Sequence, residues 1–225
     1  MPELEKIYDP AQVEDRIYRI WEDSGYFNPD NLTARGAAKK KPFTIVMPPP
    51  NANGALHVGH ALMLAIQDIL IRFERMRGGK TLWIPGADHA GFETQVVFDK
   101  KLEKEGRNRF EIPREELFAE IWNFTQKNKK VMEDQIRKIG ASCDWSREKF
   151  TLDPEIVKVV YETFKKMYED GLVYRDMRVV NWCPKHQTAL SDLEVKYVER
   201  EDPLYYIKYG PLTLATVRPE TKFGD

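Results

Sequence analysis

Two histidines three positions apart, His57 and His60, follow a proline-rich turn and enclose Gly59. The turn, residues 48–54, comes directly after an apolar run over residues 43–47, so the pattern predicts a strand, a rigid turn and a helix start. The first turn of a helix offers unpaired N–H groups and a partial positive charge to phosphate. Imidazole N–H groups there can donate hydrogen bonds to phosphate oxygens as charge builds. We therefore expect a mononucleotide site, with Gly59 allowing close approach to the backbone.

A βαβ unit is the scaffold that would position these groups. A strand over residues 43–47 leads into a helix from about Leu56 to Arg77, which Gly78 ends, and a second strand spans residues 81–84. Such a crossover gives a parallel strand pair, the start of a doubly wound sheet. The helix is expected to bury one apolar face, formed by Leu62, Ile66, Ile69, Leu70 and Phe73.

Further elements are predicted on both sides of this unit. Helices are expected over residues 9–26, 93–105, 113–139 and 153–170, with Gly171 ending the last of them. Strands are expected over residues 173–182, 204–208 and 212–217, and a polar loop over residues 28–41. The change from helix-rich to strand-rich composition near residue 180 predicts a domain boundary.

Bulk properties limit the class of protein. The chain has 225 residues, 42% of them hydrophobic, and a net charge of −1, so overall charge does not indicate nucleic-acid binding. Two distant cysteines, Cys143 and Cys183, fit a reducing compartment. The first residues lack a signal or transit composition, and no apolar run reaches membrane-spanning length. A soluble, cytoplasmic protein is expected.

The motif blocks resemble one enzyme family. Residues 48–60, PPPNANGALHVGH, are similar to the HIGH signature of class I aminoacyl-tRNA synthetases, and residues 83–95, WIPGADHAGFETQ, narrow the resemblance to valyl-tRNA synthetases. The similarity continues through residues 140–148, 180–184 and 215–221 and covers nearly the whole chain. It implies an α/β fold: the first half of a Rossmann-type nucleotide-binding domain with helical insertions, followed by the start of a β-rich editing (connective peptide) domain.

The resemblance also implies a division of the chain. Residues 1–41 would form an N-terminal helix and linker, and residues 42–182 the N-terminal half of the catalytic domain. Residues 183–204 would be a connective segment and residues 205–225 the beginning of the editing domain. No KMSKS-like loop occurs, so we expect an N-terminal portion of a longer synthetase that alone binds ATP weakly and charges tRNA negligibly.

The implied activity is ATP-dependent activation of valine and its transfer to tRNA(Val). ATP with Mg²⁺, valine and tRNA(Val) would be its substrates, and the complete enzyme is expected to be monomeric. His57, Gly59 and His60 would be catalytic and, together with Pro50 and Asn51, would bind ATP.

Three residues, Pro48, Asn51 and Asp88, are implied to bind valine. Asp88 follows a strand at its C-terminal end, where open α/β sheets place ligands, and an ionised carboxylate can hold an ammonium group. An N-cap role for Asp88 is compatible with this. His89 and Gln95 either border the site or serve packing alone.

The C-terminal part carries two weaker candidates. Four residues match the editing peptide of the family, which removes mischarged threonine because a valine pocket discriminates poorly against that isostere: Thr216, Arg218, Glu220 and Thr221. Val217 stands where the family commonly has threonine. Cys183 and His186 have the spacing of half a tetrahedral zinc site, but two ligands do not make one. A free cysteine beside a surface histidine is favoured. A zinc site stays the alternative, and the resemblance implies that its second ligand pair would come from further along the polypeptide.

Three alternative functions stay open. An isoleucyl- or leucyl-tRNA synthetase would usually carry other residues at positions 88–90. The HxGH pattern also marks small nucleotidylyltransferases, which are compact enzymes that need no editing-like strand. A non-catalytic binding module descended from a synthetase is the third, although the intact candidate residues argue against decay of a site.

Overall fold

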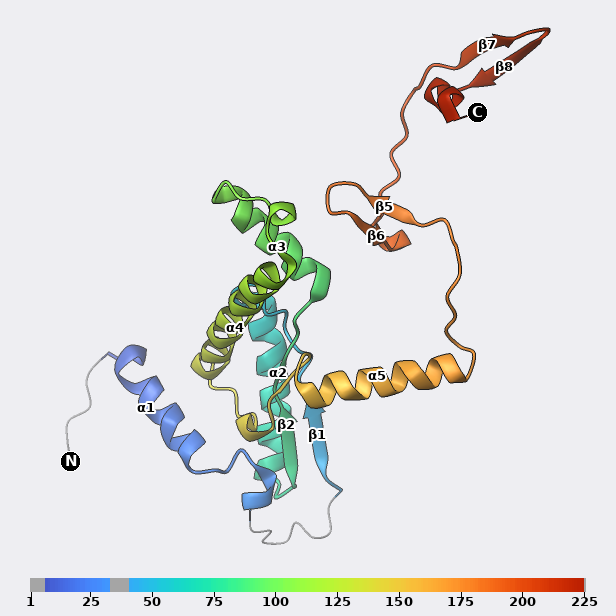
Figure 1. The fold of residues 1–225 in the computed structure, drawn as a ribbon. Helices are drawn as coiled ribbons and strands as arrows, with labels where there is room; N and C mark the ends of the chain where they lie inside the picture. The colour runs from blue at the N-terminus through green and yellow to red at the C-terminus, as the bar shows by residue number, and fades with distance from the viewer. Residues whose placement is uncertain (1–6, 33–40, 225) are drawn as a thin grey trace, which may run out of the picture. The chain divides into compact units, whose positions relative to one another are not determined.

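The computed structural model describes residues 7–32 and 41–224 (Figure 1). The chain divides into two units. The first unit is Met1–Tyr174 and the second is Arg175–Asp225, so the division falls a few residues before the boundary predicted near residue 180. Residues 1–6 and 33–40 of the predicted N-terminal segment and loop lie outside the described residues.

A βαβ unit forms the scaffold of the first unit, as predicted. β1 (Phe43–Val46) pairs in parallel with β2 (Thr81–Ile84) over its whole length, and α2 (Val58–Met76) connects them. Gly78 follows α2 with a φ of +77°, a conformation that favours glycine and ends the helix. Figure 1 shows α2 lying along both strands.

The face that α2 buries is not the predicted one. The five residues expected to face inward are all exposed, by 46% to 66%: Leu62, Ile66, Ile69, Leu70 and Phe73. Leu64 and Ile71 are fully buried instead. Apolar residues occur on more than one side of α2, so helical spacing alone does not choose a face. A polar contact helps to choose it, because Gln67 Oε1 accepts a hydrogen bond from the indole of buried Trp83 at 2.9 Å.

α4 (Arg114–Lys138) joins two small cores. It contributes Ile136 to the core that contains Trp83, and Met132 to the core that contains Phe150. The first core is completed by Met47, Leu64, Ile71, Ala141 and Cys143, and the second by Ala52 and Ala87. Residues of the βαβ unit and of the segments that follow it are therefore packed against one long helix.

A second parallel pair continues the first unit. β3 (Gly86–Ala87) follows β2 directly and pairs with β4 (Lys149–Phe150). α3 (Gly91–Lys104) comes next in the chain and packs against α4. The two predicted helices 93–105 and 113–139 are thus confirmed, with small shifts of their ends.

α1 (Pro10–Asp23) is attached to the end of α4 through Tyr18, which is 7% exposed. Its hydroxyl donates to the Ala141 carbonyl and accepts from the Trp145 indole, both at 2.8 Å. At the start of the helix Asp9 accepts the Ala11 N–H at 3.0 Å and caps the first turn.

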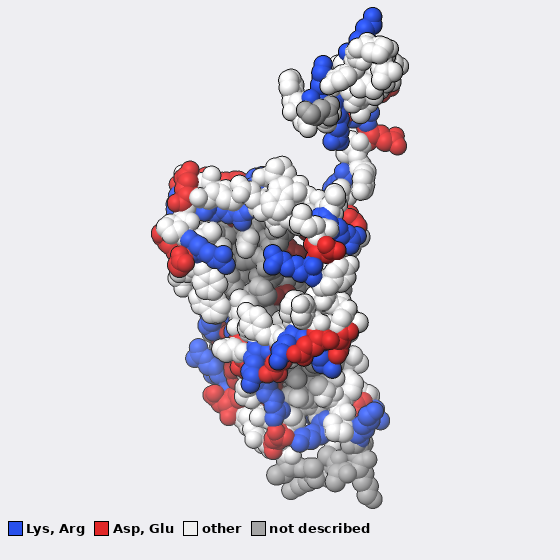
Figure 2. Space-filling model, turned by 45° about the vertical axis from the view of Figure 1, so that its right-hand side comes forward, with Lys and Arg blue, Asp and Glu red and all other residues white. Residues whose placement is uncertain are grey.

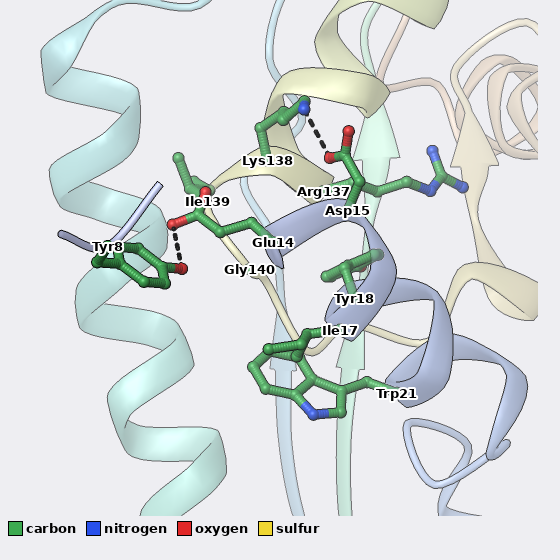
Figure 3. A pocket seen from close by; sticks show the side chains of 10 residues that line it. All are labelled: Tyr8, Glu14, Asp15, Ile17, Tyr18, Trp21, Arg137, Lys138, Ile139 and Gly140. Carbon is green, nitrogen blue, oxygen red and sulfur yellow. Dashed lines mark hydrogen bonds and ion pairs between the residues drawn. The ribbon is translucent and has the colours of Figure 1, made fainter. Parts of the chain in front are cut away.

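A hollow of about 280 Å³ lies between α1 and the end of α4 (Figure 3). Its polar side chains are engaged with one another. Lys138 Nζ lies 2.6 Å from Asp15 Oδ1, and the Tyr8 hydroxyl donates to Glu14 at 3.3 Å. We interpret this hollow as the packing seam of the two helices and not as a substrate site.

α5 (Pro154–Glu169) ends the regular structure of the first unit. It begins directly after Asp153 and is followed by Gly171 at a φ of +72°, close to the predicted limits. None of its residues is buried.

The second unit contains two antiparallel hairpins. β5 (Asn181–Cys183) pairs with β6 (Thr188–Leu190), and β7 (Tyr205–Tyr209) pairs with β8 (Leu212–Thr216). β7 and β8 agree with the predicted strands, but the strand predicted over 173–182 is wrong up to residue 180. Alternating residues form a strand only where a partner accepts and donates backbone hydrogen bonds, and β6 offers three such positions.

Short 3-10 turns complete the described structure; they span Pro29–Asn31, Arg109–Glu111, Trp145–Arg147, Asp192–Glu194 and Pro219–Gly224. Within the described ranges, no helix combines the length and apolarity needed to cross a bilayer. Figure 2 shows acidic and basic side chains interspersed on the face that it presents, in keeping with a net charge of −1.

Candidate active site

The loop that follows β1 lines a cavity of about 460 Å³. Three consecutive prolines, residues 48–50, restrict the backbone there. Five residues that the sequence proposes for ATP or valine line this cavity: Pro48, Pro50, Asn51, His57 and His60. The structure therefore gathers most of the predicted site residues of the first unit around one space.

Asp88 is joined to this loop by its backbone. Its N–H donates to the Pro50 carbonyl at 2.8 Å, and its carbonyl accepts the Ala52 N–H at 2.7 Å. These bonds form an isolated parallel bridge between Asn51 and Asp88, two residues that follow different strands. The two motif blocks of the sequence are thus held side by side by main-chain atoms.

The two histidines begin α2 as a reciprocal cap. His57 is the N-cap residue, and its Nδ1 accepts the Gly59 N–H at 3.1 Å. His60 Nδ1 accepts the His57 N–H at 3.3 Å, and the two ring centroids lie 4.0 Å apart. A ring nitrogen that accepts a hydrogen bond carries no proton, so each neutral imidazole has its N–H at Nε2. Both side chains can therefore donate to an anion from Nε2.

Gly59 is required by its histidine neighbour. A Cβ at this position would lie 2.9 Å from His57 Cε1 and 3.1 Å from its Nδ1, too close for the imidazole to stay where it is. The glycine therefore makes room for the His57 ring; whether it also makes room for a nucleotide stays a prediction.

Gly59→Ala is expected to displace the His57 ring and to lower the rate of any reaction that uses this ring by about tenfold. Complete loss of a hydrogen-bond donor would lower the rate by about 10²- to 10³-fold. Helix stability should change little, because the gain of about 1 kcal/mol from alanine offsets the loss of the cap that the displaced His57 side chain provides. Turnover and urea unfolding measure the two effects. In a His57→Asn background the ring is absent, so a further loss on adding Gly59→Ala would contradict this explanation.

Burial lowers the pKa of His60, and the neighbouring His57 lowers it further. Between that lowered pKa and the ordinary value of about 6.5, the unfolded chain binds more protons than the folded chain. The contribution of His60 to the free energy of unfolding is therefore complete above about pH 6.5 and is lost as the pH falls through the folded-state pKa.

We expect this free energy to fall more steeply between pH 7.5 and 5.5 in the unaltered chain than in His60→Gln, which cannot titrate. Urea unfolding at a series of pH values measures the difference. Parallel pH dependences of the two proteins would contradict a neutral, capping His60.

Gln135 and Thr151 are site neighbours that sequence reasoning missed. Gln135, on α4, accepts the Leu56 N–H at 2.8 Å and so holds the residue before His57. Thr151, directly after β4, donates to Asp88 Oδ1 at 3.1 Å and contacts His89. No local signal marks either residue, because their partners lie 79 and 63 positions away.

Gln95, one of the two residues that the sequence left undecided, contacts Arg109. Its Oε1 accepts from Arg109 Nη1 at 3.3 Å. His89 is different, since its backbone and ring both contact Thr151, next to Asp88. Of the two residues that the sequence left undecided, His89 belongs to the Asp88 network.

A family model described as tRNA synthetases class I (I, L, M and V) matches residues 16–215. The chain belongs to this family. It is 46% identical to the valine--tRNA ligase of Carboxydothermus hydrogenoformans over 99% of its length, and 47% identical to valine--tRNA ligase, chloroplastic/mitochondrial 2, of Arabidopsis thaliana over 100%. It covers 25% and 23% of these two proteins, so it spans about a quarter of the length of the curated relatives that it matches.

A solved structure supports the fold of this class I synthetase chain. The LeuRS in the ternary complex LeuRS-tRNA-LeuAMS of Agrobacterium radiobacter K84 matches 84% of the chain with a TM-score of 0.66. The match covers 22% of that protein at 24% sequence identity, which bears on the fold alone. The predicted α/β, Rossmann-type fold is confirmed by the family and by this structure.

In the second unit of the synthetase chain, the four predicted editing residues lie at the end of β8 and in the turn after it. Thr216 Oγ1 accepts the Arg218 N–H at 3.0 Å, and the Thr221 hydroxyl donates to the Arg218 carbonyl at 2.8 Å. Glu220 lies in the same 3-10 turn. These contacts order a turn, and an editing role for the four residues stays a prediction.

The predicted zinc pair is close in space but incomplete. Cys183 Sγ lies 3.3 Å from His186 Nδ1. Among residues 7–32 and 41–224, no group of three or more histidine, cysteine or acidic side chains could hold a metal ion. A tetrahedral zinc site needs four ligands, so the residues described do not fit one.

Proposed function

We propose that this chain carries the amino-acid-activating site of a valine–tRNA ligase, which joins valine to ATP as valyl-adenylate and transfers it to tRNA(Val). The observation that carries the proposal is the main-chain bridge between Asn51 and Asp88. It joins a loop that ends in two Nε2–H donors to a carboxylate suited to an ammonium group. The similarity to valine--tRNA ligases over the whole chain favours valine among the substrates of this family.

The proposed chemistry asks the protein for positioning and charge stabilisation. A carboxylate oxygen of valine attacks the α-phosphorus of ATP, the bond from that phosphorus to the bridging oxygen breaks, and pyrophosphate leaves. His57 and His60 donate from Nε2 to phosphate oxygens, where negative charge accumulates. Asp88 holds the valine ammonium by a charge-assisted hydrogen bond, while Pro48, Pro50 and Asn51 frame the substrates. Mg²⁺ enters as part of the ATP complex.

Further parts of the proposal rest on the resemblance and on composition. The partners are ATP, valine and tRNA(Val), the complete enzyme is a cytoplasmic monomer, and Thr216, Arg218, Glu220 and Thr221 belong to a region that edits mischarged threonine. The alternative of an isoleucyl or leucyl enzyme is not favoured by the matched relatives.

ATP–pyrophosphate exchange tests the proposal. The polypeptide of the complete reading frame that contains this chain is assayed with valine, isoleucine, leucine and threonine. We expect exchange to be fastest with valine. Faster exchange with isoleucine or leucine would contradict the substrate, and no amino-acid-dependent exchange would contradict the activity.

A further inference from the structure

Thr151 is held firmly at the point where β4 ends. Its backbone N–H donates to the Ala87 carbonyl at 3.2 Å and extends the pairing of β3 with β4 by one residue. The turn that follows is closed by Asp153, whose Oδ2 accepts the Phe150 N–H at 2.8 Å. The backbone of Thr151 is therefore fixed by hydrogen bonds at this residue and at Phe150 before it, which places its hydroxyl.

This hydroxyl lies at the centre of a small network. Thr151 Oγ1 is 2.9 Å from His89 N, 2.6 Å from His89 Nδ1 and 3.1 Å from Asp88 Oδ1. A hydroxyl has one proton and two lone pairs, and the His89 backbone N–H uses one lone pair. An ionised carboxylate can only accept, so the hydroxyl proton goes to Asp88 and the second lone pair accepts from His89 Nδ1–H. This assignment satisfies every member of the network.

The two oxygens of the Asp88 carboxylate have different surroundings. Oδ1 accepts from the Thr151 hydroxyl and from the Ala90 N–H, which lies 3.0 Å away, and it also lies 3.4 Å from His89 Nδ1. Ala90 has a φ of +55°, a left-handed conformation that is rare for alanine, so this turn is held against some strain. Within the described residues, no hydrogen bond or ion pair of Asp88 Oδ2 occurs. Oδ1 is thus held by two hydrogen bonds and the His89 contact, and Oδ2 stays available to a cation.

We propose that Thr151 is a positioning residue of the ammonium site. Through its hydroxyl it fixes the rotation of the Asp88 carboxylate, so that Oδ2 is presented to the α-ammonium group of the amino acid. The inference rests on the proposed function, in which Asp88 binds that group. Thr151 acts through Asp88 and does not contact the substrate. It should therefore increase the affinity only for ligands that carry the ammonium group.

Thr151→Val and Thr151→Ser form a matched pair of variants, because valine keeps the shape without the hydroxyl and serine keeps the hydroxyl. In ATP–pyrophosphate exchange by the complete polypeptide, Thr151→Val should raise the KM for valine about tenfold, the loss expected for one hydrogen bond to a charged group. The kcat and the KM for ATP should stay near the unaltered values. Thr151→Ser should resemble the unaltered protein.

Two ligands separate positioning from a merely structural role. The sulfamoyl-adenosine analogues of valine and of isovaleric acid differ by the amino group, and calorimetry gives the affinity of each. Thr151→Val should weaken the valine analogue about tenfold and leave the isovaleric analogue unchanged. Equal weakening of both, or no weakening of either in a protein that unfolds normally, would overturn the proposal.

The Asp88→Asn background gives a second check. Without the carboxylate, Thr151→Val should cause no further loss, and additive losses would overturn the positioning role. Amino-acid-dependent exchange by the unaltered protein tests the proposed substrate separately from the role of Thr151. If exchange were fastest with another amino acid, valine would be rejected as the substrate. The Thr151 variants would then test the ammonium contact with that other amino acid. No exchange with any amino acid would overturn both proposals.

Discussion

Asp88→Asn is expected to raise the KM for valine by about 30- to 150-fold in ATP–pyrophosphate exchange, which corresponds to about 2 to 3 kcal/mol for a hydrogen bond to a charged group. The KM for ATP should change little, because His57 and His60, the proposed phosphate donors, lie at the start of α2. Asparagine is almost the same size as aspartate, and its oxygen can still accept from Ala90 and Thr151.

The large increase in the KM for valine comes from the position of the second carboxylate oxygen, Oδ2. In Asp88→Asn a neutral NH₂ group replaces the negative oxygen, and it donates hydrogen bonds where an ammonium group also donates. The substitution therefore removes the attraction and adds an unfavourable contact while the turn is kept. Asp134→Asn is a suitable control, since Asp134 is a half-exposed carboxylate paired with Lys130 on α4. A normal KM for valine in Asp88→Asn would place the ammonium group elsewhere.

The sequence predicted those parts of the site that depend on neighbours in the chain. The cap formed by His57 and His60 is local, and its residues were identified from spacing alone. Asp88 is predicted by the family resemblance of its motif block, and the βαβ pattern agrees, because it places the ends of two parallel strands at one sheet edge. Thr151 and Gln135 could not be found in this way, since tertiary packing decides what lies beside Asp88 and Leu56.

The errors in the fold have the same origin. α2 offers more than one apolar face, and the buried Trp83 and its partner Gln67, which lie 16 positions apart, help to decide which one turns inward. The predicted strand over residues 173–182 has the right alternation, but among the residues that the structure describes no strand pairs with it before residue 181. Periodicity shows which secondary structure a segment is able to form, and its tertiary partners decide which structure it adopts.

His57→Asn should lower kcat of valine activation by about 10²- to 10³-fold, the usual cost of removing one donor to a developing negative charge. Asparagine is among the best N-cap residues, so its side chain can still accept an N–H of the first turn of α2. It removes the Nε2–H that is proposed to donate to phosphate. The free energy of unfolding should therefore stay close to that of the unaltered protein.

His57→Ala separates the two roles of this histidine. Alanine removes the donor and the cap together, so kcat should fall as in His57→Asn while the protein is destabilised by about 1 kcal/mol more. Turnover and urea unfolding of the two variants measure these effects independently. If His57→Asn kept its kcat, the imidazole would be only a helix cap.

His60→Asn and the double variant extend the comparison to the pair. Each ring is oriented by a backbone N–H of the same turn, and the rings are in contact. We therefore expect the two proposed donors to act as a unit on one group of phosphate oxygens. Residues that act as a unit lose most of their effect when either is removed. The double variant should thus be only slightly slower than the slower single variant. A loss equal to the product of the single losses would mean that the histidines act at separate steps.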